Sequence, residues 1–506
     1  MRCRFRGLPA CVPALVPLLL AGCDLGPDYQ RPPLDIPSAY RATADSAAAA
    51  WPSADWWQGF HSPDLTQLIE QARTRNFDIA AAIARVRQAD AQVRISGAAL
   101  LPGLSGTGNA GWQHEGIGAF SGGTGFQRGG ANASFDFHQY STGLSAAYEL
   151  DFWGRNLATR QSAIASAMFS RFDQQTVALT VVSNVATTWF TALSFADRLA
   201  VARNNLAAAE STLAVIQGRF AAGTANALDV SQQEALVAGV RATIPNFQSQ
   251  REQQLIALGI LVGEPPERIT VRPGTLTALD LPPVTPGLPS ELLARRPDIA
   301  AAEAQLLAQN FNVKVARAAF FPSISLTGTA AYQAAALNRL ITPGTALASA
   351  AAALAQPIFD GGTLRGELDL AKGRYDELLA DYRKAVVQAF TDVDTAMTAW
   401  RYATQQETLQ RDAVAKASRA ATIARAQLEA GTVDVTTVLT AEATLFGDED
   451  TLVQVRLARA QALLNLYKAL GGGWTIPGGP IEAQFPGLTP GLLPGGVALP
   501  VGGNLR

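Results

Sequence analysis

The side chains that most often carry out chemistry are scarce in this chain. Its 506 residues include only three histidines, His61, His114 and His138, and none lies at the spacing of a metal site. No serine–histidine–aspartate pattern and no phosphate-binding loop occurs, because the clustered glycines near Gly122 and Gly471 lack the strand and helix that such loops need. The sequence therefore predicts a protein that is not an enzyme and that binds no metal ion or diffusible cofactor.

One cysteine lies in a pattern that predicts covalent modification. Three early arginines precede an apolar stretch that ends in Leu20-Ala-Gly-Cys23. This arrangement is typical of a signal peptide, and its last four residues resemble the lipobox of bacterial lipoproteins. We expect residues 1–22 to be removed and Cys23 to carry an S-diacylglycerol and an N-acyl lipid; the alternative is an ordinary secretory signal with an incidental cysteine. Cys3 and Cys11 would leave with the signal, so no disulfide is expected.

The residues after Cys23 bear on where the protein is sorted and held. Asp24 follows the cysteine directly, and in some enteric bacteria such an aspartate retains lipoproteins in the inner membrane. We still expect the protein to reach the outer membrane, because a transmembrane β-barrel, which the strands described below suggest, would override that retention signal. Residues 23–62 are rich in Pro, Ala and Ser, which predicts an extended, lipid-anchored segment over the surface, with Trp56, Trp57 and Phe60 as its anchor.

The overall charge excludes one class of partner. A formal net charge of -2 gives no basic surface for nucleic acid. Charged residues make up only 16% of the chain, which together with abundant alanine predicts large areas of close helix contact. No run of 18 apolar residues follows the N-terminus, so a membrane-spanning helix is not expected.

Two stretches of the chain repeat one another. Asp78-Ile-Ala-Ala-Ala82 corresponds to Asp298-Ile-Ala-Ala-Ala302, and Pro102 corresponds to Pro322, at a constant offset of about 220 residues. At each proline the hydrophobic period changes from about 3.6 to 2, so a helix leads directly into a strand. Proline suits this junction because it cannot continue the helix and keeps the preceding residue extended.

The strands that follow alternate between apolar and polar residues. On one face lie Leu104, Ala110, Trp112, Leu144 and Tyr148, while serine, threonine and asparagine lie on the other. Such strands of about ten residues fit a transmembrane β-barrel, although a soluble sheet with one wet face fits the pattern equally well. Two hairpins cannot close a barrel, since about eight strands are the usual minimum, so several chains would have to contribute.

Two long helical hairpins complete the duplicated layout. Leu199, Leu206, Leu213 and Phe220 recur every seven residues, with Ala202, Ala209 and Ile216 three residues later, which predicts a coiled-coil packing line. Gly223-Thr224 and Gly431-Thr432, about 208 residues apart, are expected to turn the helices. We therefore predict one structural repeat over residues 63–272, a second over 285–470, and a Gly/Pro-rich tail over 471–506.

Several motifs together resemble one family. Gly22-Cys-Asp-Leu-Gly-Pro-Asp-Tyr-Gln-Arg-Pro32, Gly287-Leu-Pro-Ser-Glu-Leu-Leu-Ala-Arg-Arg-Pro-Asp-Ile299, Ala318-Ala-Phe-Phe-Pro-Ser-Ile-Ser-Leu326 and Leu466-Tyr-Lys-Ala-Leu-Gly-Gly-Gly-Trp474 are similar to motifs of the outer membrane factors, the TolC-like channels, and most closely to the NodT-type efflux lipoproteins. The resemblance covers residues 20–474. It implies an α+β membrane protein: a homotrimer in which long helices form a coiled-coil barrel and each chain gives four strands to one shared 12-stranded β-barrel.

The resemblance also implies a functional site at the helix turns. Gly223, Thr224, Gly431 and Thr432 would form the periplasmic tip, on which a periplasmic adaptor protein docks. In relatives the tip is closed by rings of aspartates and arginines, but here the corresponding positions are Thr440 and Ala443, so a charge-locked gate is not expected. The candidates for lining the aperture are Thr436, Thr440, Asp434, Glu442, Asp229 and Glu234. If the carboxylates of Asp434, Glu442, Asp229 and Glu234 crowd together at the aperture, some of their pKa values should rise. The negative charge there should also favour the entry of cations.

The predicted function is an outer-membrane channel of a tripartite efflux pump. It would export drugs, toxic compounds or metals, together with an adaptor and an inner-membrane transporter of the resistance–nodulation–division type. The chain itself carries no ATP-binding motif. Two alternatives stay open: a type I secretion duct, and a periplasmic structural lipoprotein whose hairpins bind a partner without spanning the bilayer.

Overall fold

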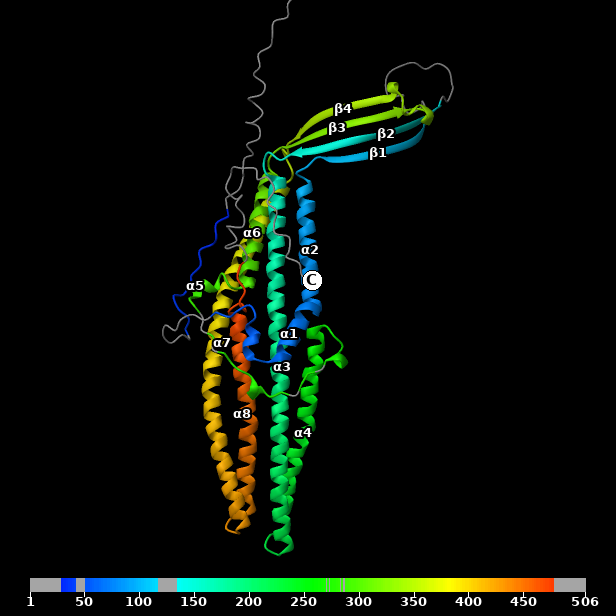
Figure 1. Cartoon of the computed structure of the whole chain (residues 1–506). Coiled ribbons are helices and arrows are strands. Elements are labelled where there is room, and N and C mark those ends of the chain that lie inside the picture. Colours follow the sequence, from blue (N-terminus) through cyan, green and yellow to red (C-terminus); the bar gives the residue numbers. More distant parts are fainter. Residues whose placement is uncertain are drawn as a thin grey trace, which may run out of the picture.

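The computed structural model describes residues 29–41, 51–116, 134–269, 271–272, 274–282, 284 and 287–476 (Figure 1). The two halves of the chain have the same order of elements. The first half comprises α1 Pro63–Arg75, α2 Phe77–Ala98, β1 Gly103–Gly116, β2 Ser134–Leu150, α3 Arg155–Ala221 and α4 Ala227–Val262. The second comprises α5 Pro289–Leu292, α6 Pro297–Ala318, β3 Ser323–Ala334, β4 Ala346–Ala355, α7 Thr363–Glu429 and α8 Val435–Ala469.

The corresponding helices of the two halves have nearly equal lengths, except that α1 has 13 residues and α5 only 4. The helices α3 and α7 each have 67 residues, and α2 and α6 each have 22. At 1.5 Å per residue, each of the two longest helices spans roughly 100 Å. In the lower part of the molecule the helices lie in the order α7, α8, α3, α4, with the sheet at the opposite end (Figure 1).

The four strands form one antiparallel sheet in the order β1-β2-β3-β4. The register places Leu104 opposite Ala146, Tyr148 opposite Leu326 and Ile324 opposite Leu354, so one face is mainly apolar. Its polar members are Thr142, His114, Asp136 and His138. The other face carries the small polar residues of all four strands: Ser105, Thr107, Asn109, Ser141, Ser145, Ser325, Thr327, Thr329 and Ser349. The alternation predicted from the sequence is confirmed, and β1 and β4 each leave one edge unpaired within the described residues.

The junction between β2 and α3 in the first half contacts the junction between α6 and β3 in the second. The indole nitrogen of Trp153 donates a hydrogen bond of 2.7 Å to the carbonyl oxygen of Pro322, and its ring stacks on Phe321. This contact lies where the sheet meets the helices, and it fixes the direction in which the strands leave the helical body.

The main apolar core lies midway along the helices. Trp56, Trp57 and Phe60 are buried there, as predicted, and Trp56 stacks on Tyr467 with ring centroids 4.9 Å apart. One helix in the described part, α3, is long and apolar enough to cross a membrane by length and composition, but half of that stretch is buried against other helices. Core helices of soluble proteins have the same property.

The coiled-coil line differs in part from the prediction. Ala202, Ala209 and Ile216 are buried as expected, but Leu206 and Leu213 are only half-buried and Phe220 is 48% exposed. The polar residues Asn205 and Thr212 are buried instead. Within one chain α3 therefore packs through alanines, Ile216 and two polar residues, while Leu206, Leu213 and Phe220 stay partly exposed.

The N-terminal segment runs over the second half of the chain. Residues 29–41 contain no helix or strand, and Arg31 holds Glu303 of α6 through two hydrogen bonds of 2.7 and 2.5 Å. Tyr40 is buried among residues of α6, α7 and α8. The Pro-rich segment is thus fixed to the helical body at these two points.

Candidate functional site at the hairpin tips

The two helix turns share one backbone geometry. Gly223 and Gly431 have φ values of 74° and 73°, in the left-handed region where glycine carries no Cβ penalty. The amide of Thr224 donates to the carbonyl of Arg219, and that of Thr432 donates to the carbonyl of Gln427, at 2.8 and 2.9 Å. These bonds satisfy carbonyl groups that a helix end would otherwise leave unpaired. The adaptor-docking role predicted for both turns stays a prediction.

Two of the predicted aperture acids begin the returning helices. Asp229 forms a capping box with Asn226 at the start of α4, and Asp434 is the N-cap of α8, where its carboxylate accepts hydrogen bonds from the amide and hydroxyl of Thr437. These two bonds hold the pKa of Asp434 below its ordinary value. Within one chain this is opposite to the rise expected from crowded carboxylates, because hydrogen-bond donors to the carboxylate favour its charged form.

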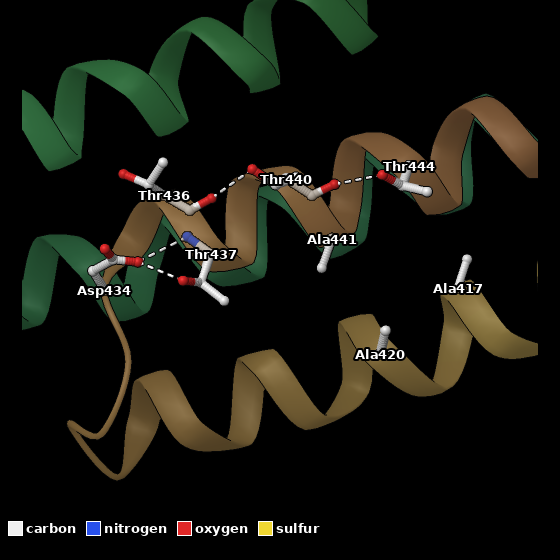
Figure 2. A pocket seen from close by; sticks show the side chains of 8 residues that line it. All are labelled: Ala417, Ala420, Asp434, Thr436, Thr437, Thr440, Ala441 and Thr444. Atoms are coloured by element: carbon white, nitrogen blue, oxygen red, sulfur yellow. Dashed lines mark hydrogen bonds between the residues drawn. The ribbon is translucent and has the colours of Figure 1, made fainter.

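The two predicted aperture threonines are exposed and line a groove between α7 and α8 (Figure 2). The hydroxyl of Thr440 donates to the carbonyl of Thr436, and that of Thr444 donates to the carbonyl of Thr440. Each of these two hydroxyls is therefore bonded back to its own helix. This face presents small side chains and one carboxylate, that of Asp434. We call this the outer groove; its lining residues are Ala417, Ala420, Asp434, Thr436, Thr437, Thr440, Ala441 and Thr444.

The structure contradicts the aperture role predicted for Glu442. Its side chain is 0% exposed and lies inside the chain, between α8 and α3. The carboxylate accepts hydrogen bonds from Thr212 at 2.6 Å, Arg425 at 2.7 Å and Gln233 at 3.3 Å. A carboxylate enclosed by three donors is satisfied where it is, and it does not line a surface of the chain.

The remaining predicted site residues are placed as follows. Glu234 is exposed on α4 and makes no hydrogen bond or ion pair within the described part of the chain. Cys23, together with the predicted signal at residues 1–22, lies outside the described residues. Among the residues that are described, no cluster of His, Cys, Asp and Glu suits a metal ion.

Three residues at this site have no distinguishing sequence motif. Thr212, Gln233 and Arg425 come from α3, α4 and α7, and with Glu442 of α8 they form a cluster to which all four helices contribute. Arg219 adds a further link, since its guanidinium donates to the carbonyl of Leu428 at the end of α7. The signal that could have found them is the 208-residue correspondence, because Thr212, Gln233 and Arg425 match Ala420, Ala441 and Gln217 and so depart from the repeat.

This site binds the four helices together and supplies a polar surface near the tips. A long helical body that carries a four-stranded sheet with one mainly apolar face fits a channel of the bacterial outer membrane. The model of the outer membrane efflux protein family matches residues 68–264 and 288–472, which is most of both halves. The chain belongs to this family.

Similar proteins agree with that assignment over nearly the full length. The pyoverdine export outer membrane protein OpmQ of Pseudomonas aeruginosa is 40% identical over 457 residues, covering 90% of this chain and 95% of that protein. The cation efflux protein CusC of Escherichia coli K12 is 31% identical, covering 91% and 99%. The open-state structure of the Neisseria gonorrhoeae MtrE outer membrane channel matches with a TM-score of 0.78 at 28% identity, covering 89% and 98%. The predicted family, fold, efflux function and outer-membrane location are confirmed.

Proposed function

We propose that three copies of this chain assemble into one efflux duct. The observation that supports this most directly is the sheet: four strands with one apolar and one polar face, and with two unpaired edges. In a bilayer an unpaired edge is costly, because no water is there to bond its backbone groups. Joining β4 of one copy to β1 of the next removes every edge, and three copies give twelve strands around a lumen lined by serine and threonine.

We propose further that the tips meet a periplasmic adaptor, which links the duct to an inner-membrane transporter of the resistance–nodulation–division type. The support is the pair of equal turns at Gly223-Thr224 and Gly431-Thr432, which give the end of the helices repeated docking elements. Small molecules are the proposed cargo, since the relatives OpmQ and CusC serve pyoverdine export and cation efflux. The chain itself would provide the passage for the cargo and would control the opening of that passage, and it would carry out no catalytic step.

The proposed lipid on Cys23 would anchor the chain near the sheet. Arg31 and Glu303 fix the N-terminal segment on α6, whose C-terminal end leads into β3. Six peptide units separate Cys23 from Tyr29, so the lipidated residue can lie at most about 20 Å from Tyr29. Residue 303 is 15 residues before the end of α6, which is roughly 22 Å along the helix axis. The two lengths are similar, which supports attachment to the periplasmic leaflet at the base of the barrel.

The test combines mass and conductance. Purified protein in detergent should have the mass of three chains, including the lipid, and should conduct ions after insertion into planar bilayers. A monomer that stays soluble once the lipid is removed would contradict the proposal and would favour a periplasmic structural lipoprotein. Replacing Cys23 by alanine with a cleavable secretory signal should abolish the lipid mass while leaving the trimer intact.

A further inference from the structure

The polar face of the sheet carries very few charged residues. By the strand register this face consists mainly of glycine, alanine, serine, threonine and amide residues. Within the four described strands only two of its positions hold a charged residue: Glu115, at the end of β1 far from the helices, and Glu149, at the end of β2 beside them. The charge that this face presents to passing ions therefore depends on very few side chains.

Glu149 lies where the sheet meets the helices. It is opposite Ser325, one residue before β2 ends at Leu150, and α3 begins shortly afterwards at Arg155 (Figure 1). The side chain of Glu149 is 41% exposed, and its Oε1 atom is 4.0 Å from Nη1 of Arg155, whose side chain is 52% exposed. That distance is too long for a hydrogen bond, so both charged groups stay open to water.

An open cavity of about 280 Å³ borders both charged groups. It is also lined by Ser323 and Ala355, which are opposite each other in β3 and β4 on the polar face of the sheet. The cavity therefore opens on that face, at the base of the sheet. Water and small ions can reach Glu149 and Arg155 from there.

Asp151 borders the same cavity, but its carboxylate has a structural role. It accepts hydrogen bonds from the amides of Asn156 and Leu157, at 3.0 and 2.8 Å, and so satisfies two amides at the start of α3. The cavity is thus lined by two carboxylates and one guanidinium, and its formal charge is negative.

This set of charges occurs once per chain. At the 208-residue offset Glu149 corresponds to Pro357, and Arg155 corresponds to Thr363. The second half therefore contributes no carboxylate and no guanidinium at the equivalent positions. Three copies around one axis would place three such sets at one level of the duct.

We propose that these sets form the charge filter of the pore, and that Glu149 gives the filter its preference for cations. The inference rests on the proposed trimer, in which the polar face of the sheet lines the lumen. Three copies then carry three net negative charges at the base of the barrel, and rings of carboxylates favour cations in channels. Without Glu149 the charges of Asp151 and Arg155 balance, and the preference disappears.

The size of the proposed barrel sets the strength of this filter. Twelve strands that are about 4.8 Å apart and tilted by about 40° have a circumference of roughly 75 Å, so the strands lie about 12 Å from the axis. Salt screens charges over about 10 Å at 0.1 M and about 3 Å at 1 M. Three net charges at about 12 Å therefore change the cation-to-anion ratio on the axis by about threefold at 0.1 M, and by less than about a tenth at 1 M.

Reversal potentials of single trimers in planar bilayers test the assignment. In KCl gradients near about 0.1 M the native protein should favour K⁺ over Cl⁻. Glu149→Gln should lower the K⁺/Cl⁻ permeability ratio by about threefold, and Arg155→Gln should raise it by about threefold. At about 1 M KCl the three proteins should agree. Both side chains are about half exposed, so each variant should keep the native mass of the trimer.

Glu70→Gln is the matched control. It removes an exposed carboxylate from α1, which the whole of α2 separates from the sheet, and it should leave the permeability ratio unchanged. If Glu149→Gln forms conducting trimers with the native permeability ratio, the inference is overturned and the proposed duct stands. An equal change in Glu70→Gln would also overturn it, because the effect would then not belong to the base of the sheet. If native trimers pass no current, the proposed function itself fails.

Discussion

Glu442 shows how strongly one buried carboxylate can depend on its neighbours. It lies between helices with no exposure and is matched by Arg425 and two neutral donors. Removing one partner of such a buried ion pair leaves the other charge without compensation. The stability lost in this way is far larger than the net stability that the intact pair contributes over apolar side chains at the same positions. The contact therefore fixes which faces of α3 and α8 meet, whatever its net contribution to stability.

Replacing Glu442 by alanine should lower the free energy of unfolding by roughly 3–5 kcal/mol, because Arg425 stays partly buried with no carboxylate. Glu442→Gln should cost less, since it keeps the hydrogen-bond acceptor. The matched control is Glu234→Ala, which is exposed and should change stability in one chain by less than about 0.5 kcal/mol. Denaturant titration followed by circular dichroism measures the difference, and equal costs at the two positions would refute this account of the cluster.

Glu407 predicts how stability depends on acid. Burial alone would raise the pKa of this carboxyl, but hydrogen bonds from Arg459 and Arg411 outweigh it, and the pKa lies below its ordinary value. The resulting stabilisation is present above the unfolded-state pKa of glutamate and is lost as the pH falls through the lowered folded-state pKa. Melting temperatures measured across the acid range should therefore decline more steeply for the native chain than for Glu407→Gln. A parallel decline in both would contradict the prediction.

At the level of elements, much of the structure could be predicted from the sequence. Period-2 alternation gave the two faces of the sheet, and Gly223 and Gly431 marked the turns, because both signals arise from neighbours in the chain. The environments of Glu234 and Glu442 could not be predicted in this way. The two glutamates occupy corresponding positions in the repeat, but α8 packs against α3 whereas α4 has no comparable second neighbour in its own chain, and this long-range difference has no local signal.

The tip turns depend on backbone conformation and not on side-chain contact. No atom lies within 4 Å of a Cβ built on Gly223, so Gly223→Ala should cost only the left-handed conformation, about 1–2 kcal/mol. Gly218 is the matched control, since it lies in regular helix with equally open space, and Gly218→Ala should be neutral or stabilise by up to about 1 kcal/mol. Thermal unfolding of both variants compares them directly. If Gly223→Ala is as stable as Gly218→Ala, the turn does not need its glycine.

At the scale of the whole molecule, one chain is incomplete in two places. The sheet has two unpaired edges, and the hairpins have an unfilled groove on one side and an unpaired carboxylate on the other. In the proposed trimer a neighbouring copy pairs each sheet edge, and three copies close the sheet around one axis. The proposed duct is the space that this closure encloses.

The central claim is that this closure makes one shared conducting pore. The most direct measurement is single-channel recording of purified, mass-verified trimers in planar bilayers, with the tips viewed by cryo-electron microscopy of the same sample. We expect one conducting unit per trimer. Trimers that pass no current although their tips are open would contradict the account.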